Sequence, residues 1–107
     1  MIIKEKISKE KFEELADGAS MVKMAVDIKK EIMSLGCELH MDCADELMQN
    51  GSENKNVWGA NIYPKKMALD FSAVFNIRPG MGNRSMEIQD VEITRNVEEV
   101  IKKLLPI

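Results

Sequence analysis

Several residue types that commonly carry function are scarce in this chain. One histidine and two cysteines occur among its 107 residues, which excludes metal motifs built from several histidines and the multi-bridge framework of a small secreted domain. No apolar run is long enough to cross a bilayer, and the N-terminal stretch turns charged at Lys4, unlike a signal peptide. The sequence therefore predicts a cytoplasmic protein with no membrane partner.

The chain also lacks an excess of positive charge. Lysine and arginine number 15, aspartate and glutamate 18, and the formal net charge is -3. Because duplex nucleic acid is held mainly by cations on its phosphates, non-specific nucleic-acid binding is not expected. With 45% hydrophobic and 31% charged residues, the composition is that of a folded globular protein. We expect a single domain over residues 1–107, and no motif predicts a cofactor.

Both ends of the chain carry helix signals. Ser8 is an N-cap for a first helix, and Asp17-Gly18 is a stop signal. Asp90 caps a final helix, and Pro106 ends it. One stripe of this second helix is apolar, formed by Ile93, Val97, Val100, Ile101 and Leu104. These patterns predict a helix at each terminus.

Alternating apolar residues between the two helices predict strands. Asn50-Gly51 is a strong hairpin signal, and a two-residue turn there would pair 39–43 with 58–62, apolar against apolar. A four-residue loop, Pro64–Met67, would lead into a strand over 68–78. For residues 20–35 the spacing fits either a strand or a helix, and both interpretations stay open.

The predicted fold is an α+β two-layer sandwich. An antiparallel β-meander of about four strands has both terminal helices packed on its one apolar face. In the alternative, residues 20–35 are helical. The other face of the sheet is expected to be polar and open.

That open face is the first candidate site. The predicted registers place Glu31, His40, Asn61 and Asp70 in one row, with Asp42 and Tyr63 on the same face. An imidazole among carboxylates can act in acid–base catalysis or bind a metal. The candidate catalytic residues are His40, Asp42 and Asp70, and a metal would add Glu31 to them. The simpler interpretation, which we favour, is a solvated polar sheet face.

A second candidate is the loop Arg78–Ser85. Its polar residues Arg78, Asn83, Arg84 and Ser85, with Asn61 and Tyr63 from the sheet face, predict a site for an anionic small molecule. The alternative is a long connection whose arginines pair with nearby acids. In a third group, Cys37, His40 and Cys43, a strand would turn His40 away from both cysteines, which favours buried free thiols.

Four motifs resemble, in order, a family of short prokaryotic proteins known as a domain of unknown function. They are GCELHMD, NGS, VWGANIYP and FNIRPGMGNRSMEIQD. The resemblance runs from about Met21 to Asp90 and into the last helix. It implies a prokaryotic protein and transfers no activity or catalytic residue. It also implies Gly-Gly before Glu-Leu-His, so Cys37 stands where the second glycine is expected.

The sequence leaves the function unknown, and whether the protein is an enzyme stays open. The favoured hypothesis is a small binding module for an anionic ligand or a partner protein. One alternative is a homodimeric regulatory protein that pairs through an exposed edge strand. The other is a small metal-dependent hydrolase.

Overall fold

The computed structural model describes residues 1–107 and confirms the α+β class with an antiparallel sheet. Five strands lie in the order β1-β3-β2-β4-β5. Their bounds are β1 Ile2–Ile3, β2 Val22–Asp27, β3 Ile32–Cys37, β4 Val57–Tyr63 and β5 Ala68–Asp70. Because β4 returns beside β2 rather than β3, the sheet is not the predicted meander, and it has one strand more than expected.

The two terminal helices form as predicted, α1 over Lys9–Ala16 and α3 over Val91–Leu104. Ser8 Oγ accepts a hydrogen bond from the Lys11 amide at 3.1 Å, and Asp17 ends α1 in the left-handed conformation. The Asp90 carboxylate accepts from the amides of Glu92 and Ile93. None of the helices combines the length and apolar character that crossing a membrane requires.

The predicted hairpin at Asn50-Gly51 is wrong, because residues 40–49 form a helix, α2 (His40–Gln49). Cys43, Ala44 and Leu47 have helical spacing and are buried together against the sheet. Gly51 has a φ of 99°, and its amide donates to the Met48 carbonyl. The Asn-Gly pair therefore ends a helix, a place where glycine is also favoured.

Residues 20–35 are neither one strand nor a helix, because they contain β2 and most of β3, which form a hairpin. Asp27 Oδ1 accepts hydrogen bonds from the amides of Lys29 and Lys30, each at 2.9 Å, and Glu31 adopts a φ of 56°. The turn has no glycine or proline. The fully buried Asp27 carboxylate holds it instead.

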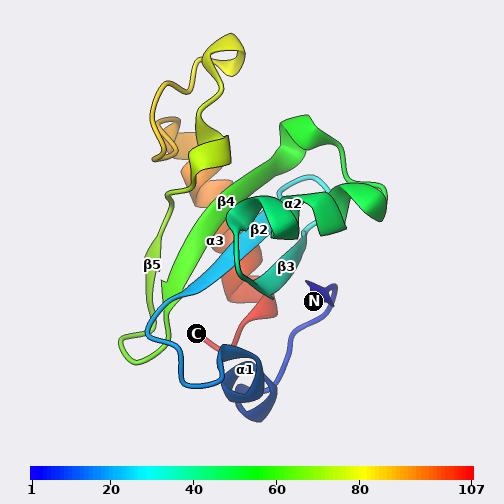
Figure 1. Ribbon diagram of the computed structural model, residues 1–107, viewed down its shortest axis with the longest axis vertical. Helices are drawn as coiled ribbons and strands as arrows, with labels where there is room; N and C mark the ends of the chain where they lie inside the picture. Colours follow the sequence, from blue (N-terminus) through cyan, green and yellow to red (C-terminus); the bar gives the residue numbers. More distant parts are fainter.

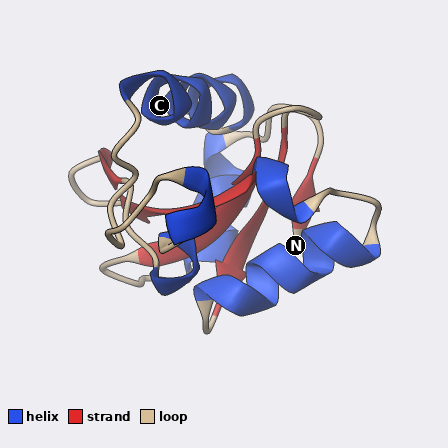
Figure 2. Ribbon diagram, turned by 90° about the horizontal axis from the view of Figure 1, so that it is seen from above, coloured by secondary structure: helices blue, strands red, loops and turns tan.

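Helices cover both faces of the sheet (Figure 1 and Figure 2). On one face, α1 and α3 share the main core with residues of β2, β3 and β4, including Met24, Leu35, Trp58 and Ile62. On the other face, α2 packs over Ala25 and Val57. The polar, open face that the sequence predicts is therefore largely covered by α2.

Beyond Asp70 the chain leaves the sheet, so the predicted strand over 68–78 is wrong after three residues. The Pro64–Met67 loop is confirmed, and it pairs Ile62 with Leu69. Further along β4, the Asn76 side chain replaces the missing strand, accepting from the Gly59 amide at 2.8 Å and donating to the Gly59 carbonyl at 3.0 Å. A Cβ on Gly59 would lie 2.4 Å from the Ala73 Cβ, so glycine permits this approach.

Candidate functional site

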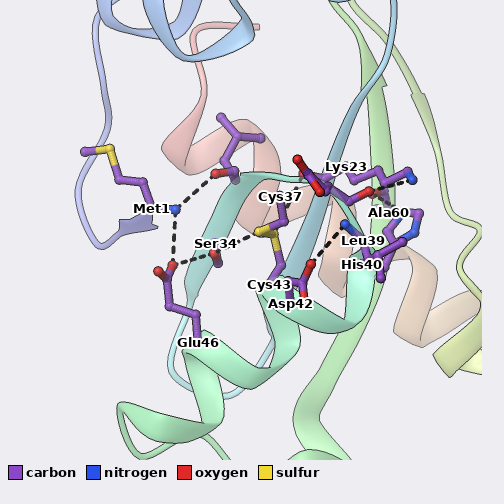
Figure 3. Close-up of a disulfide and its surroundings, with 12 residues drawn as sticks. Met1, Lys23, Ser34, Cys37, Leu39, His40, Asp42, Cys43, Glu46 and Ala60 are labelled. Carbon is purple, nitrogen blue, oxygen red and sulfur yellow. Dashed lines mark hydrogen bonds and ion pairs between the residues drawn. A yellow bond between two sulfur atoms is a disulfide. The ribbon is translucent and has the colours of Figure 1, made fainter.

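Cys37 and Cys43 form a disulfide, which corrects the prediction of free thiols (Figure 3). Their Cα atoms are 5.7 Å apart, an ordinary separation for this bond. Cys37 is the last residue of β3, and Cys43 lies in the first turn of α2. The pairing was missed because the sequence was interpreted as a strand through Cys43, whereas a helix brings Cys43 back over β3.

The two cysteines differ in accessibility. Cys43 has 0% exposure and its Sγ lies 4.0 Å from the Lys23 carbonyl oxygen, whereas Cys37 is half-buried. Ser34 Oγ lies 3.7 Å from Cys37 Sγ and donates a hydrogen bond of 2.7 Å to Glu46 Oε1. That bond lowers the pKa of Glu46, burial opposes the shift, and the ammonium group of Met1 also favours the carboxylate.

The start of α2 lacks the polar N-cap residue that most helices have. Its N-cap is Leu39, which has no side-chain group to accept from the free amides of the first turn. The leucine exposes 60% of its surface and Met41 exposes 43%. The Asp42 carboxylate makes the one side-chain hydrogen bond to an amide of this helix start, accepting from the Leu39 amide at 3.3 Å. The segment between the two cysteines therefore exposes the apolar side chains of Leu39 and Met41, and a polar residue at position 39 would stabilise the helix more.

A polar row crosses the sheet at this end of α2. Cys37, Lys23, Asn61 and Asp70 are register partners on β3, β2, β4 and β5. His40 Nε2 lies 2.6 Å from Asn61 Oδ1 and 3.2 Å from the Ala60 carbonyl. Since both neighbours are oxygens, Nε2 carries the hydrogen and donates it. Asn61 and Asp70 are adjacent as predicted, while His40 reaches Asn61 from the helix above.

The proposed metal ligands are not brought together. Glu31 lies in the β2–β3 turn and pairs with Lys103 Nζ at 3.3 Å, and Asp42 holds the start of α2. Asp70 accepts a 3.4 Å hydrogen bond from the Tyr63 hydroxyl. No group of three or more histidine, cysteine or acidic side chains is arranged to hold a metal. The metal-dependent hydrolase hypothesis therefore has no support from the positions of its proposed ligands.

The Arg78 side chain bonds backbone carbonyls and packs on an aromatic ring within the fold. Its guanidinium donates to the carbonyls of Phe75, Asn54 and Val57 at 3.1, 3.1 and 2.5 Å. The same group lies 4.6 Å from the centre of the Trp58 ring, a cation–π contact, and burial lowers the pKa of Arg78. These contacts tie the segment after β5 to β4 and leave few donors for a ligand.

The Asn83 side chain likewise bonds backbone groups of the loop in which it lies. Its Nδ2 lies within 3.0 Å of the carbonyls of Asn76, Ser85 and Glu87, and its Oδ1 accepts from the Gln89 amide. Ser85 Oγ accepts from the Glu87 amide. Arg84 is exposed and makes no ion pair. Of the four residues predicted to bind an anion in this loop, only Arg84 keeps its side chain free.

Comparison with known proteins yields a family and no described relative. No curated protein and no solved structure matches the chain. A family model described as "Protein of unknown function (DUF5674)" matches residues 1–104. The match covers nearly the whole chain, and it confirms the resemblance that the four motifs indicate. The chain therefore belongs to this family of proteins of unknown function.

Proposed function

We propose that the protein is a thiol–disulfide redox protein whose working groups are Cys37 and Cys43. The observation that carries this proposal is the pairing of a half-buried cysteine at a strand end with a fully buried one in the first turn of a helix. We further propose the cytoplasmic location that the sequence predicts. In that compartment a disulfide is typically transient and serves catalysis or redox sensing.

The difference in burial assigns the order of events. A thiolate of the partner attacks Cys37 Sγ, because Cys43 has no exposed surface. The bond between Cys37 and Cys43 breaks, and its electron pair leaves on Cys43 as a thiolate. A second thiolate of the partner then attacks the mixed disulfide and releases Cys37. The partner thiols are oxidised by two electrons to a disulfide, and the cysteine pair is reduced to two thiols.

The fold stabilises the leaving group. Cys43 lies in the first turn of the ten-residue helix α2, and the N-terminal end of a helix favours negative charge. Once protonated, the Cys43 thiol has the Lys23 carbonyl as an acceptor. At Cys37, the Ser34 hydroxyl oxygen lies 3.7 Å from the sulfur, and because its hydrogen is donated to Glu46 it can accept from a protonated Cys37 thiol. Each sulfur thus has an acceptor for its thiol form.

The reverse reaction follows from the same geometry. In the reduced protein, Cys37 is the thiol that can reach a partner disulfide, and Cys43 resolves the resulting mixed disulfide. The resemblance implies glycine at position 37, so this redox couple is proposed for this chain and not for every member of the family.

Trapping the mixed disulfide tests the assignment. Cys43→Ser keeps Cys37 and removes the resolving sulfur, so incubation with glutathione disulfide is expected to give a stable glutathione adduct, detected by mass spectrometry. Cys37→Ser is the matched control, and its buried Cys43 is expected to react at least tenfold more slowly. Circular dichroism checks that both variants are folded. If the two cysteines react at similar rates, or Cys37 does not react, the proposal is wrong.

A further inference from the structure

His40 ties the start of α2 to the sheet between the two cysteines. It is the first residue of α2 and stands midway in the sequence from Cys37 to Cys43. Its Nε2 lies 2.6 Å from Asn61 Oδ1 and 3.2 Å from the Ala60 carbonyl oxygen, both on β4. In Figure 3 the His40 ring lies beside Ala60, away from the two sulfur atoms. The imidazole is therefore placed to hold the helix on the sheet and not to exchange a proton with a sulfur.

Asn61 offers His40 a fixed acceptor. Its side chain is 5% exposed, and its Nδ2 donates to the Ser72 carbonyl at 3.0 Å. Since that bond fixes the orientation of the amide, Oδ1 is the atom that faces His40 and accepts from Nε2. A hydrogen bond with a buried partner is stronger than a fully solvated one, because the local dielectric constant is lower. Strand β4 thus gives the start of α2 a rigid anchor.

Little else holds the start of α2 when the disulfide is open. Leu39 gives no side-chain cap, and the Asp42 carboxylate bonds within the helix start itself. Lys23 Nζ reaches the Glu38 carbonyl at 2.8 Å, but that bond is exposed. Beyond the cysteine itself, the buried residues of the helix begin at Ala44. The imidazole bond is therefore the main polar tether of the first turn.

The two sulfurs depend on this tether to different degrees. Cys37 lies at the end of β3 and is paired in the sheet with Lys23 of β2, so its position does not depend on α2. Cys43 belongs to the first turn of α2, and its distance from Cys37 is set by how that turn sits on the sheet. In the reduced protein, a helix start that leaves the sheet would carry Cys43 away. The effective concentration of one thiol at the other would then fall.

We propose that His40 is a positioning residue of the redox couple, which holds Cys43 within reach of Cys37 in the reduced protein. This role rests on the proposed redox function and concerns its resolving step. In that step, Cys43 gives up its proton and bonds to Cys37 Sγ of the mixed disulfide, while the partner sulfur leaves with the electron pair and takes up a proton. A held Cys43 makes the step fast and makes the finished disulfide harder to reduce.

The equilibrium of the full-length protein with glutathione tests this role. Oxidised and reduced forms are counted by alkylation and mass spectrometry in buffers of defined glutathione ratio. His40→Phe keeps a ring and removes the donor, so it is expected to lower the equilibrium constant for disulfide formation about fivefold, a shift of about 20 mV to a less negative potential. His40→Gln supplies an amide donor at the same position and should restore the constant to within about twofold of the parent value.

The lifetime of the mixed disulfide gives a second readout, which a general loss of stability would not change. Reduced protein is mixed with glutathione disulfide, quenched with acid and analysed by mass spectrometry. Cys37 is expected to take up glutathione at the parent rate in every variant, whereas the adduct should last about fivefold longer in His40→Phe. Asn50→Ala is the matched control, because it removes a hydrogen bond at the other end of α2, and it should change neither readout.

The outcomes separate this role from the proposed function. If the constant of His40→Phe stays within about twofold of the parent value, or Asn50→Ala shifts it equally, the positioning role is wrong and the redox function stands. Failure of His40→Gln to restore the constant also overturns the role. Circular dichroism checks folding, and His40→Ala, which removes the same donor, replaces His40→Phe if the latter does not fold. If Cys37 of the parent protein takes up no glutathione, the redox function fails, and the positioning role fails with it.

Discussion

Replacing Asn76 with alanine is expected to lower the free energy of unfolding by about 3 kcal/mol. The Asn76 side chain is fully buried and makes three hydrogen bonds: it accepts from the Gly59 amide and donates to the carbonyls of Gly59 and Met86. It occupies the place that a continued β5 would have taken beside β4. Alanine would remove three hydrogen bonds and leave the Gly59 amide and carbonyl without partners, at about 1 kcal/mol for each bond lost.

The corresponding fall in melting temperature follows from the size of the chain. For 107 residues, the entropy of unfolding is about 0.22 kcal/mol per kelvin. A loss of about 3 kcal/mol therefore lowers the midpoint by about 13 °C. Urea denaturation measures the free energy, and differential scanning calorimetry measures the midpoint.

Two comparison variants make this prediction specific. Asn76→Asp keeps the shape and the acceptor for Gly59 but places oxygen against two carbonyls, so it is expected to cost at least as much as alanine. Asn50→Ala removes an exposed hydrogen bond to the Glu46 carbonyl and is expected to cost under about 1 kcal/mol. A cost under about 1 kcal/mol for Asn76→Ala would refute the idea that its amide substitutes for a strand.

Three further predictions concern the region around the disulfide. Reduction of Cys37–Cys43 removes a cross-link between residues six positions apart, and the chain-entropy model gives a loss of about 2 kcal/mol, measurable by urea denaturation with and without reductant. Leu39→Ser supplies the missing N-cap of α2 and should raise stability by about 0.5–1 kcal/mol in the same assay. Because the pKa of Glu46 is lowered in the folded state, its contribution is present above the ordinary value of 4.5 and is lost as pH falls below it. Ser34→Ala should reduce that acid sensitivity, and identical pH–stability curves for Ser34→Ala and the parent protein would contradict this.

The terminal helices could be predicted because their signals are local. Ser8, Asp17 and Asp90 act within one helical turn, and the apolar stripe of α3 has one period throughout. The middle of the chain lacked such signals. Asn50-Gly51 suits a hairpin and a helix end equally well, so the apolar match of 39–43 with 58–62 that supported the hairpin was a coincidence. The β2–β3 turn has no glycine, and the buried Asp27 carboxylate stabilises it by accepting from two backbone amides. A single aspartate is a weak sequence signal for a turn.

The candidate site was harder to predict than the fold because it depends on long-range contacts. The sequence placed Asn61 beside Asp70, and the structure agrees because the Pro64–Met67 loop fixes that register. The disulfide depends on α2 folding back over β3, and a spacing of six residues does not by itself predict that Cys37 and Cys43 are bonded. Arg78 and Asn83 were predicted to face a ligand, but both bind backbone carbonyls. Composition alone does not distinguish a loop whose polar side chains bind a ligand from one whose polar side chains bond the protein's own backbone.

The reduction potential of the Cys37–Cys43 pair tests the central claim most directly. The oxidised and reduced forms are equilibrated in buffers of defined glutathione ratio, alkylated, and quantified by mass spectrometry. A redox protein is expected to have a potential between about −270 and −120 mV, within the range of known thiol–disulfide proteins. A potential below about −300 mV would identify a purely structural disulfide and contradict the account.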